Sequence, residues 1–204
     1  REKFLANALG SRQRLGRCSL GTRAPLFVSS AFGFARSRQA LTHRYPCTEG
    51  FMKDAVFREG RTIDADGIKA VVFSVLLEYG LEPDPTETDA DLDDVESSFK
   101  GGHFEVCEIK GRIAGTWGLF PLGDGVCELR KMYLSPEFRG RGLGKLMLTR
   151  AIDKARALGF KKVELETASV LKDAIALYEN HGFKPRPRSH MAPRCDKSFE
   201  LVLA

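Results

Sequence analysis

The sequence is short of the features that mark a membrane protein, a disulfide-bonded secreted protein or a zinc protein. The apolar stretch 26–34 (LFVSSAFGF) is shorter than the roughly 20 residues that a membrane-spanning helix requires. The four histidines are scattered, without the spacing of metal ligands. The cysteines are odd in number and form no C-x-x-C pair, which argues against a disulfide framework and for a reducing compartment; they are Cys18, Cys47, Cys107, Cys127 and Cys195. We therefore predict a cytoplasmic protein with no membrane segment and no bound metal.

Acidic residues are scarce in the first quarter of the chain. Residues 1–50 contain nine Lys or Arg and two acids, a net charge of +7, so the remaining residues carry −2 of the total of +5. The basic isoelectric point of about 9.0 therefore arises from the N-terminal segment. A near-neutral remainder gives no charge argument for a nucleic-acid-binding core, and we predict none.

The change in composition predicts two parts, a poorly structured basic extension over 1–51 and a folded domain over 52–204. The extension has no clear amphipathic period, and its scattered Arg, Ser and Gly are typical of disorder or of an organelle transit peptide. A third interpretation is that Met52 is the natural start and that the residues before it are not native. A nucleic-acid partner would have to bind through this extension.

The apolar pattern of 52–204 predicts an α/β fold with the element order βααβββαβαββ. Helical spacing of apolar residues favours helices at 68–79, 89–98, 144–158 and 171–178. Strand patterns lie at 55–61, 103–109, 112–120, 126–134, 162–166, around Phe183 and at 199–203. The sheet is expected to be mixed, antiparallel in its first half and parallel across the helix at 144–158.

Two segments are expected to lie at the surface. Residues 89–98 are acidic, and we expect a short helix with a solvated acidic face; the alternative is that these acids guide a basic substrate into a site. Residues 184–197 are basic and rich in proline, which predicts a long loop.

The stretch 134–158 (LSPEFRGRGLGKLMLTRAIDKARAL) organises the chain. A strand ends at Ser135-Pro136, because proline has no N–H for strand pairing. Three glycines, Gly140, Gly142 and Gly144, then allow the backbone to approach a ligand closely. The helix that follows begins with unpaired N–H groups and a partial positive charge, which suits a phosphate. Arg139, Arg141 and Lys145 add positive charge, so we predict a pyrophosphate site here.

Two well-known phosphate loops do not fit this stretch. The Walker loop requires Ser or Thr after Gly-Lys, but Leu146 follows Lys145. The dinucleotide fingerprint requires G-x-G-x-x-G, and the spacing of Gly140, Gly142 and Gly144 differs from it. An ordinary glycine-rich turn with solvated arginines is the alternative.

Two motifs together resemble the GCN5-related N-acetyltransferase (GNAT) family. The first is Arg139-x-x-Gly142-x-Gly144, and the second is the segment 174–183 (AIALYENHGF), about 30 residues later in the same order as in the family. The resemblance covers about residues 55–204. It implies a GNAT-type mixed antiparallel/parallel central sheet of about six to seven strands flanked by helices. It also implies acetyl-CoA as co-substrate and direct attack of an amine on the thioester in a ternary complex.

The resemblance also implies where acetyl-CoA binds. It would lie in a cleft where the strand that ends at Leu134 separates from the strand at 163–166, with backbone groups of Met132, Tyr133 and Leu134 pairing with the pantetheine. A backbone amide of this same strand segment would donate to the oxyanion. The pyrophosphate would be held by the amides of Arg139, Gly140, Arg141, Gly142, Leu143, Gly144 and Lys145.

Three residues are candidates for the proton transfers, one as the acid and two as the base. Tyr178 matches the family tyrosine that acts as general acid near the sulfur, but its helical stripe is equally explained by a core tyrosine. Glu128 lies where the histone acetyltransferase branch has its glutamate base; the alternatives are a pair with Arg130 and a water chain instead of a fixed base. Glu166 is a second candidate for the base. Leu171 departs from the family, since many members have a cofactor-binding Asn there.

The acceptor is expected to be a small-molecule or peptide amine, and the motifs do not choose among amines. Acids within 64–100 would favour a polyamine, an aminoglycoside or a lysine side chain. Arg186, Arg188 or Arg194 could instead bind the carboxylate of an amino acid. A monomer or a homodimer is expected. The alternative function is an acyl-CoA-binding sensor or regulatory module without turnover.

Overall fold

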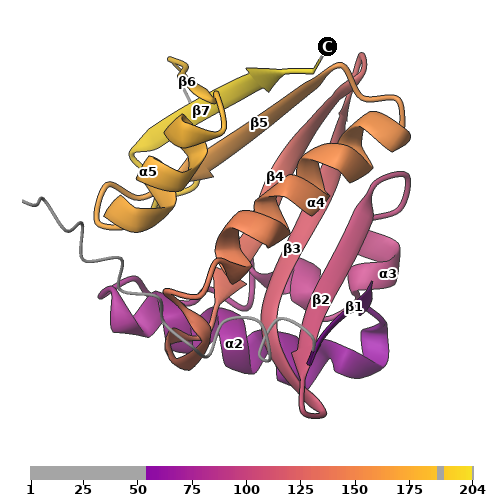
Figure 1. Cartoon of the computed structure of the whole chain (residues 1–204), viewed down its shortest axis with the longest axis vertical. Helices are drawn as coiled ribbons and strands as arrows, with labels where there is room; N and C mark the ends of the chain where they lie inside the picture. Colours follow the sequence, from indigo (N-terminus) through magenta and orange to yellow (C-terminus); the bar gives the residue numbers. More distant parts are fainter. Residues whose placement is uncertain (1–53, 188–190, 204) are drawn as a thin grey trace, which may run out of the picture. The chain divides into compact units, whose positions relative to one another are not determined.

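A mixed sheet with the strand order β1-β2-β3-β4-β5-β7-β6 is the centre of the fold in the computed structural model, which describes residues 54–187 and 191–203 (Figure 1). β4 and β5 pair in parallel, and the other neighbouring strands pair antiparallel. The strands are β1 (Ala55–Glu59), β2 (His103–Ile109), β3 (Arg112–Gly123), β4 (Val126–Leu134), β5 (Lys162–Thr167), β6 (Lys184–Pro185) and β7 (Lys197–Val202). The predictions for 1–51 and for Met52 lie outside the described residues.

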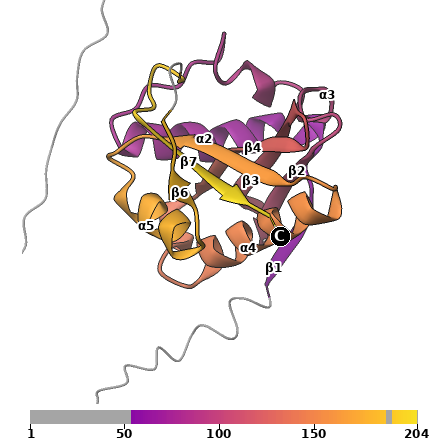
Figure 2. The ribbon, with the colours of Figure 1, turned by 90° about the horizontal axis from the view of Figure 1, so that it is seen from above.

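Helices cover both faces of the sheet (Figure 2). They are α2 (Ala65–Glu78), α3 (Val95–Ser98), α4 (Leu143–Ala157) and α5 (Lys172–Asn180), with 3-10 turns η1 (Thr62–Asp64), η2 (Ala90–Leu92) and η3 (Pro136–Phe138). The predicted order βααβββαβαββ and the predicted mixed sheet are confirmed. None of the helices in the described part of the chain has the length and apolar composition needed to cross a membrane.

The alternation of side chains along β2 explains the two cores. Phe104 and Val106 point to the face covered by α2, where they pack with Ile68 and Val72. Cys107 points to the opposite face, in the core formed with α4 and α5. The helices α2 and α4 each bury one apolar stripe against the sheet, as their spacing predicted.

The acidic segment 89–98 lies at the surface with Asp93 and Glu96 exposed, as predicted, but one of its acids is buried. It forms η2 and α3, and Asp89 is fully buried, with 0% of its surface exposed. Leu92 and Val95 are buried as well and anchor the segment in the α2 core. The prediction is wrong only for Asp89, because two basic residues distant in sequence neutralise it.

The last predicted strands are also placed slightly differently. Phe183 is buried in the core before β6, and it is Lys184 and Pro185 that pair with β7. The predicted loop therefore contains the two residues of β6 at its start and reaches the first residue of β7 at its end.

Candidate active site

The strands β4 and β5 diverge, and the candidate active site lies in the opening between them. Their parallel pairing runs from Val126–Lys162 to Leu129–Leu165, and β4 then continues to Leu134. In the described sheet, the last five residues of β4 therefore have their β5-side backbone groups without a strand partner. Such a row of groups can pair with an extended ligand.

A cavity of about 890 Å³ occupies this opening. It is lined by the end of β4, by the loop of residues 139–145, which we call the glycine loop, by the end of β5 and by α5. Its remaining walls come from α2, from the segment 87–91 and from residues 191–195, which we call the strap. Every predicted site residue except Arg141 and Leu143 is among those that line it.

The glycine loop forms a turn that leads into α4. Gly140 and Gly142 have φ values of 72° and 82°, in the left-handed region that favours glycine. Gly142 is the residue that precedes α4, and no side chain in the described part of the chain caps the helix there. The first N–H groups of α4 are thus available to an anion at the cavity wall.

Arg139 has a different role from the one predicted for its charge. Its guanidinium donates to both carboxylate oxygens of Glu78 at 2.8 Å and to the carbonyl oxygen of Leu134 at 2.9 Å. This pairing neutralises the charge that the sequence interpretation counted toward the phosphate site. The side chain of Arg139 fastens the glycine loop to α2, while its backbone stays in the loop.

A bulge interrupts β4 beside the cavity. Arg130 pairs with Gly118 and Tyr133 pairs with Thr116, so Lys131 and Met132 together face one residue of β3. Lys131 adopts a φ of 53°, and its carbonyl oxygen accepts a hydrogen bond of 2.7 Å from the Thr116 hydroxyl. The bulge turns the backbone of 131–133 out of the regular ladder at the cavity wall.

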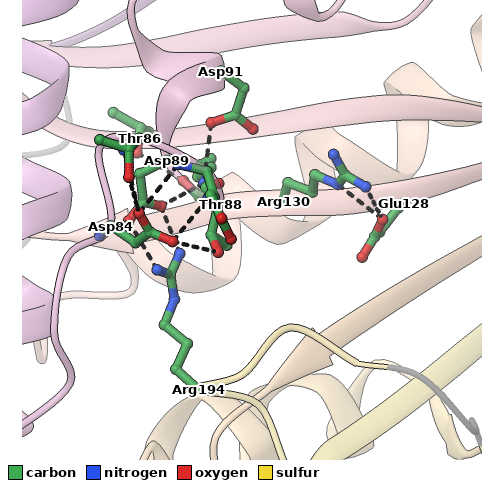
Figure 3. Close-up of polar contacts among 11 residues, drawn as sticks. Asp84, Thr86, Thr88, Asp89, Asp91, Glu128, Arg130 and Arg194 are labelled. Atoms are coloured by element: carbon green, nitrogen blue, oxygen red, sulfur yellow. Dashed lines mark hydrogen bonds and ion pairs between the residues drawn. The ribbon is translucent and has the colours of Figure 1, made fainter.

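Five residues form a largely buried polar group that we call the Asp89 cluster: Thr88, Asp89, Asp91, Lys131 and Arg194. Figure 3 labels all of them except Lys131. The Lys131 amine lies 2.6 Å from both the Thr88 carbonyl oxygen and Asp89 Oδ1. Arg194 donates to both oxygens of Asp89, at 2.8 and 2.5 Å. Burial alone would raise the pKa of Asp89, but the hydrogen bonds from Arg194 and Lys131 outweigh it and lower the pKa.

Tyr178 lines the cavity from α5 and is 6% exposed. Its ring packs against Phe183, with 5.8 Å between the ring centroids. Burial raises the pKa of Tyr178, and the neighbouring Tyr133 raises it further. Tyr133 is half-buried, and desolvation raises its pKa to about 12. The structure thus places Tyr178 both in the core and at the cavity wall.

Glu128 also lines the cavity, and it is paired with Arg130, as one of the sequence interpretations held (Figure 3). Two guanidinium nitrogens of Arg130 donate to Glu128 Oε2 at 2.8 and 2.6 Å. Arg130 in turn lies over the ring of Phe120, 3.9 Å from its centroid. Glu166, the second candidate for the base, lines the cavity and accepts a hydrogen bond from the Ala192 amide at 2.9 Å.

Known proteins with this architecture identify the family. The profile of the acetyltransferase (GNAT) family matches residues 70–183, which is more than half of the chain. The chain belongs to the GNAT acetyltransferase family. YjgM, an uncharacterized N-acetyltransferase of Escherichia coli, is 41% identical over 128 residues, which cover 59% of this chain and 77% of that protein.

Solved structures of GNAT acetyltransferases share the fold. A GNAT family acetyltransferase of Staphylococcus aureus superposes with a TM-score of 0.69 at 21% identity, covering 74% of this chain and 99% of its own. A GNAT phosphinothricin acetyltransferase of Sinorhizobium meliloti, solved in complex with AcCoA, gives a TM-score of 0.59 at 20% identity, with 74% and 89% covered. These structures show the shared fold, and the family match together with the N-acetyltransferase relatives shows that the chain is an acetyltransferase enzyme.

At Leu171 this chain departs from many GNAT members, which have an Asn at that position. Leu171 lines the cavity and precedes α5, so an apolar side chain lies where many members have a polar one. Of the two proposed substitutes, Thr167 lines the cavity and Ser169 donates its amide to Asp196 at 2.7 Å. Among the described residues, no group of three or more His, Cys, Asp or Glu side chains could hold a metal ion.

Sequence reasoning missed the Asp89 cluster and the pairing of Glu78 with Arg139. Asp89 and Arg194 are separated by 105 residues, and Glu78 and Arg139 by 61. A single sequence carries no signal that joins such distant charges. The acidity of 89–98 is evident in the sequence, but acidity alone gives no reason to expect that one of these acids is buried.

Proposed function

We propose that this enzyme transfers an acetyl group from acetyl-CoA to a primary amine by direct attack in a ternary complex. The observation that carries the proposal is the opening between β4 and β5 beyond Leu129, which leads directly to the N-terminus of α4. An extended pantetheine fits a strand edge, and a pyrophosphate fits the amides of a helix start. One cavity provides both.

The residues proposed to bind the co-substrate fall into two groups. Backbone groups of Met132, Tyr133 and Leu134 would pair with the pantetheine, and an amide of this segment would donate to the oxyanion. The pyrophosphate would be held by backbone amides within Arg139, Gly140, Arg141, Gly142, Leu143, Gly144 and Lys145. The left-handed φ of Gly140 and Gly142 supports this assignment.

Tyr178 is proposed as the general acid. The amine nitrogen forms a bond to the thioester carbonyl carbon, the carbon–sulfur bond breaks, and the departing thiolate takes the proton of the Tyr178 hydroxyl. Burial, which raises the pKa of Tyr178, keeps the hydroxyl protonated at neutral pH. Its place at the cavity wall supports this role.

Glu128, or a chain of water molecules instead of it, is proposed to take the proton from the amine. Glu128 lines the cavity from β4, but its Oε2 already accepts two hydrogen bonds from Arg130. The pairing with Arg130 therefore gives weight to the water chain.

The acceptor is proposed to be a small-molecule or peptide amine. Two of the arginines considered as carboxylate ligands are already engaged, Arg194 by Asp89 and Arg186 by Glu164. This favours an amine without a carboxylate over an amino acid. Arg188 lies outside the described residues. We further propose that the catalytic domain spans 52–204 and that 1–51 form a separate basic extension.

The test is a panel of amines incubated with acetyl-CoA while free thiol release is followed. The panel pairs lysine with cadaverine, its counterpart without the carboxylate. Steady turnover on one amine class supports the proposal, and turnover of cadaverine above lysine supports the acceptor class. Tight CoA binding without turnover on any amine would contradict transfer and indicate a sensor.

A further inference from the structure

Lys131 needs support from outside its own strand. Its φ of 53° lies in the left-handed region, which is unfavourable for a residue with a side chain. Contacts to its backbone carbonyl and to its side-chain amine stabilise this conformation. The carbonyl accepts from the Thr116 hydroxyl. The amine donates to the Thr88 carbonyl and to Asp89 Oδ1 at 2.6 Å, and it forms an ion pair with Asp91 Oδ1 at 3.1 Å.

Asp89 joins the bulge to the strap. The Asp89 carboxylate accepts hydrogen bonds from the amine of Lys131 in β4 and from two guanidinium nitrogens of Arg194 in the strap. The same carboxylate accepts the Asp84 amide at 2.9 Å, which fixes it to its own loop. Figure 3 shows Arg194 reaching toward this loop from the other side of the view.

Burial makes this connection rigid. Asp89 is fully buried, and the side chains of Lys131 and Arg194 are 5% and 14% exposed. A buried charge that loses its partner is strongly unfavourable, so the three charged groups move together or not at all. The loop, the bulge and the strap are thereby held in one arrangement.

All three segments also line the cavity. Asp91 comes from the loop, Lys131 and Tyr133 come from β4, and Arg194 and Cys195 come from the strap. An acceptor that contacts the loop or the strap therefore touches groups whose positions depend on Asp89. The same carboxylate also fixes the backbone of 131–133.

We propose that Asp89 is a positioning residue that orients the bulge amides of 131–133 and couples them to the strap that receives the acceptor. Asp89 acts through Lys131 on the bulge and through Arg194 on the strap. The kinetic test of this inference rests on the proposed amine acetylation, whereas a second test below does not.

The kinetic experiment compares Arg194→Gln with Arg150→Gln. Arg150 donates to both oxygens of the buried Glu105 at 2.7 Å and is not among the residues that line the cavity, so it is a control with the same two-point geometry, although its side chain is more exposed than that of Arg194. Arg194→Gln should raise the KM for the amine and lower kcat, each by about tenfold. Arg150→Gln should change both by less than about twofold. Arg194→Lys, which keeps the charge, should recover part of the loss.

The second experiment measures amide hydrogen exchange of 129–134 without any substrate. Arg194→Gln should lower protection of the bulge amides by about tenfold, and Arg150→Gln should not. Asp89→Asn should act in the same direction, but it removes the charge that Lys131 and Arg194 share and leaves Lys131 with Asp91, so Arg194→Gln is the primary variant. Equal protection in the two Arg→Gln variants would overturn the inference. Absence of amine turnover in the wild type would refute the proposed function, and the exchange result would still decide the role of Asp89.

Discussion

Asp89 and Arg194 are 105 residues apart in the sequence and form a two-point ion pair with distances of 2.8 and 2.5 Å. The pair links the loop before η2 to the strap before β7. Lys131 completes it from the bulge of β4. The part of the cavity wall formed by 87–91, the bulge and the strap is thus held by charges, whereas the cores on both faces of the sheet are apolar.

This ion pair predicts a specific acid sensitivity. Since the pKa of Asp89 is lowered in the folded state, the stabilisation it provides is complete above the unfolded pKa of about 3.9 and is lost as the pH falls below it. Arg194→Gln should unfold more easily at pH 7 and should lose less further stability on acidification. Thermal unfolding of both proteins between about pH 7 and pH 3 checks this. Parallel curves would contradict it.

Gly142 is predicted to serve binding through its backbone. Its φ of 82° strains any residue with a side chain, although nothing in the described part of the chain lies within 4 Å of an added Cβ. Gly142→Ala should cost about 1 kcal/mol of stability and weaken CoA binding about tenfold, because the first amides of α4 shift. Calorimetric titration with CoA measures the binding.

The matched control is Gly159→Ala. Gly159 has a φ of 81° and equally open space among the described residues, but it lies at the other end of α4. It should lose similar stability and keep its affinity for CoA. A similar loss of affinity in both variants would show that strain alone, and not the phosphate contact, explains the effect.

Tyr178→Phe keeps the packing against Phe183 and removes the proton. We expect kcat to fall about a hundredfold, with little change in thermal stability. Because burial raises the pKa of Tyr178, the wild-type rate should show no loss at alkaline pH from this group below about pH 10. Phe183→Leu is the packing control and should reduce stability more than rate. An unchanged kcat in Tyr178→Phe would show that the tyrosine is only a core residue.

Glu128→Gln distinguishes a fixed base from a water chain. If Glu128 takes the proton, kcat/KM should fall about a hundredfold and the acid limb of its pH profile should disappear. Glu164 is the control, since it is opposite Glu128 in the β4–β5 register, is equally buried and does not line the cavity. Glu164→Gln should leave kinetics unchanged. A pH profile of Glu128→Gln that matches the wild type would assign the proton transfer to water.

The elements of the fold could be predicted because their signals are local. β2 and β4 have the predicted bounds, 103–109 and 126–134, since their apolar residues lie between clear turn residues. The glycine turn and the start of α4 follow from Gly142 and the helical spacing after it. These features depend on neighbours within a few residues along the chain.

The charges of the site could not be predicted in this way. Arg139 looked like a phosphate ligand, but Glu78 lies on an α2 turn that the fold brings next to it. The sequence alone suggests that Asp89 is solvated, whereas in the fold Lys131 and Arg194 form ion pairs with it. Pairing of distant charges depends on tertiary structure, and a single sequence does not encode it in any local pattern.

The most direct test of the account is a crystal structure of the protein with bound CoA. We predict the pyrophosphate at the amides of 139–145 and the pantetheine along Met132, Tyr133 and Leu134, between β4 and β5. A coenzyme bound elsewhere, or no binding at all, would contradict the central claim that this opening in the sheet is the acetyl-CoA site.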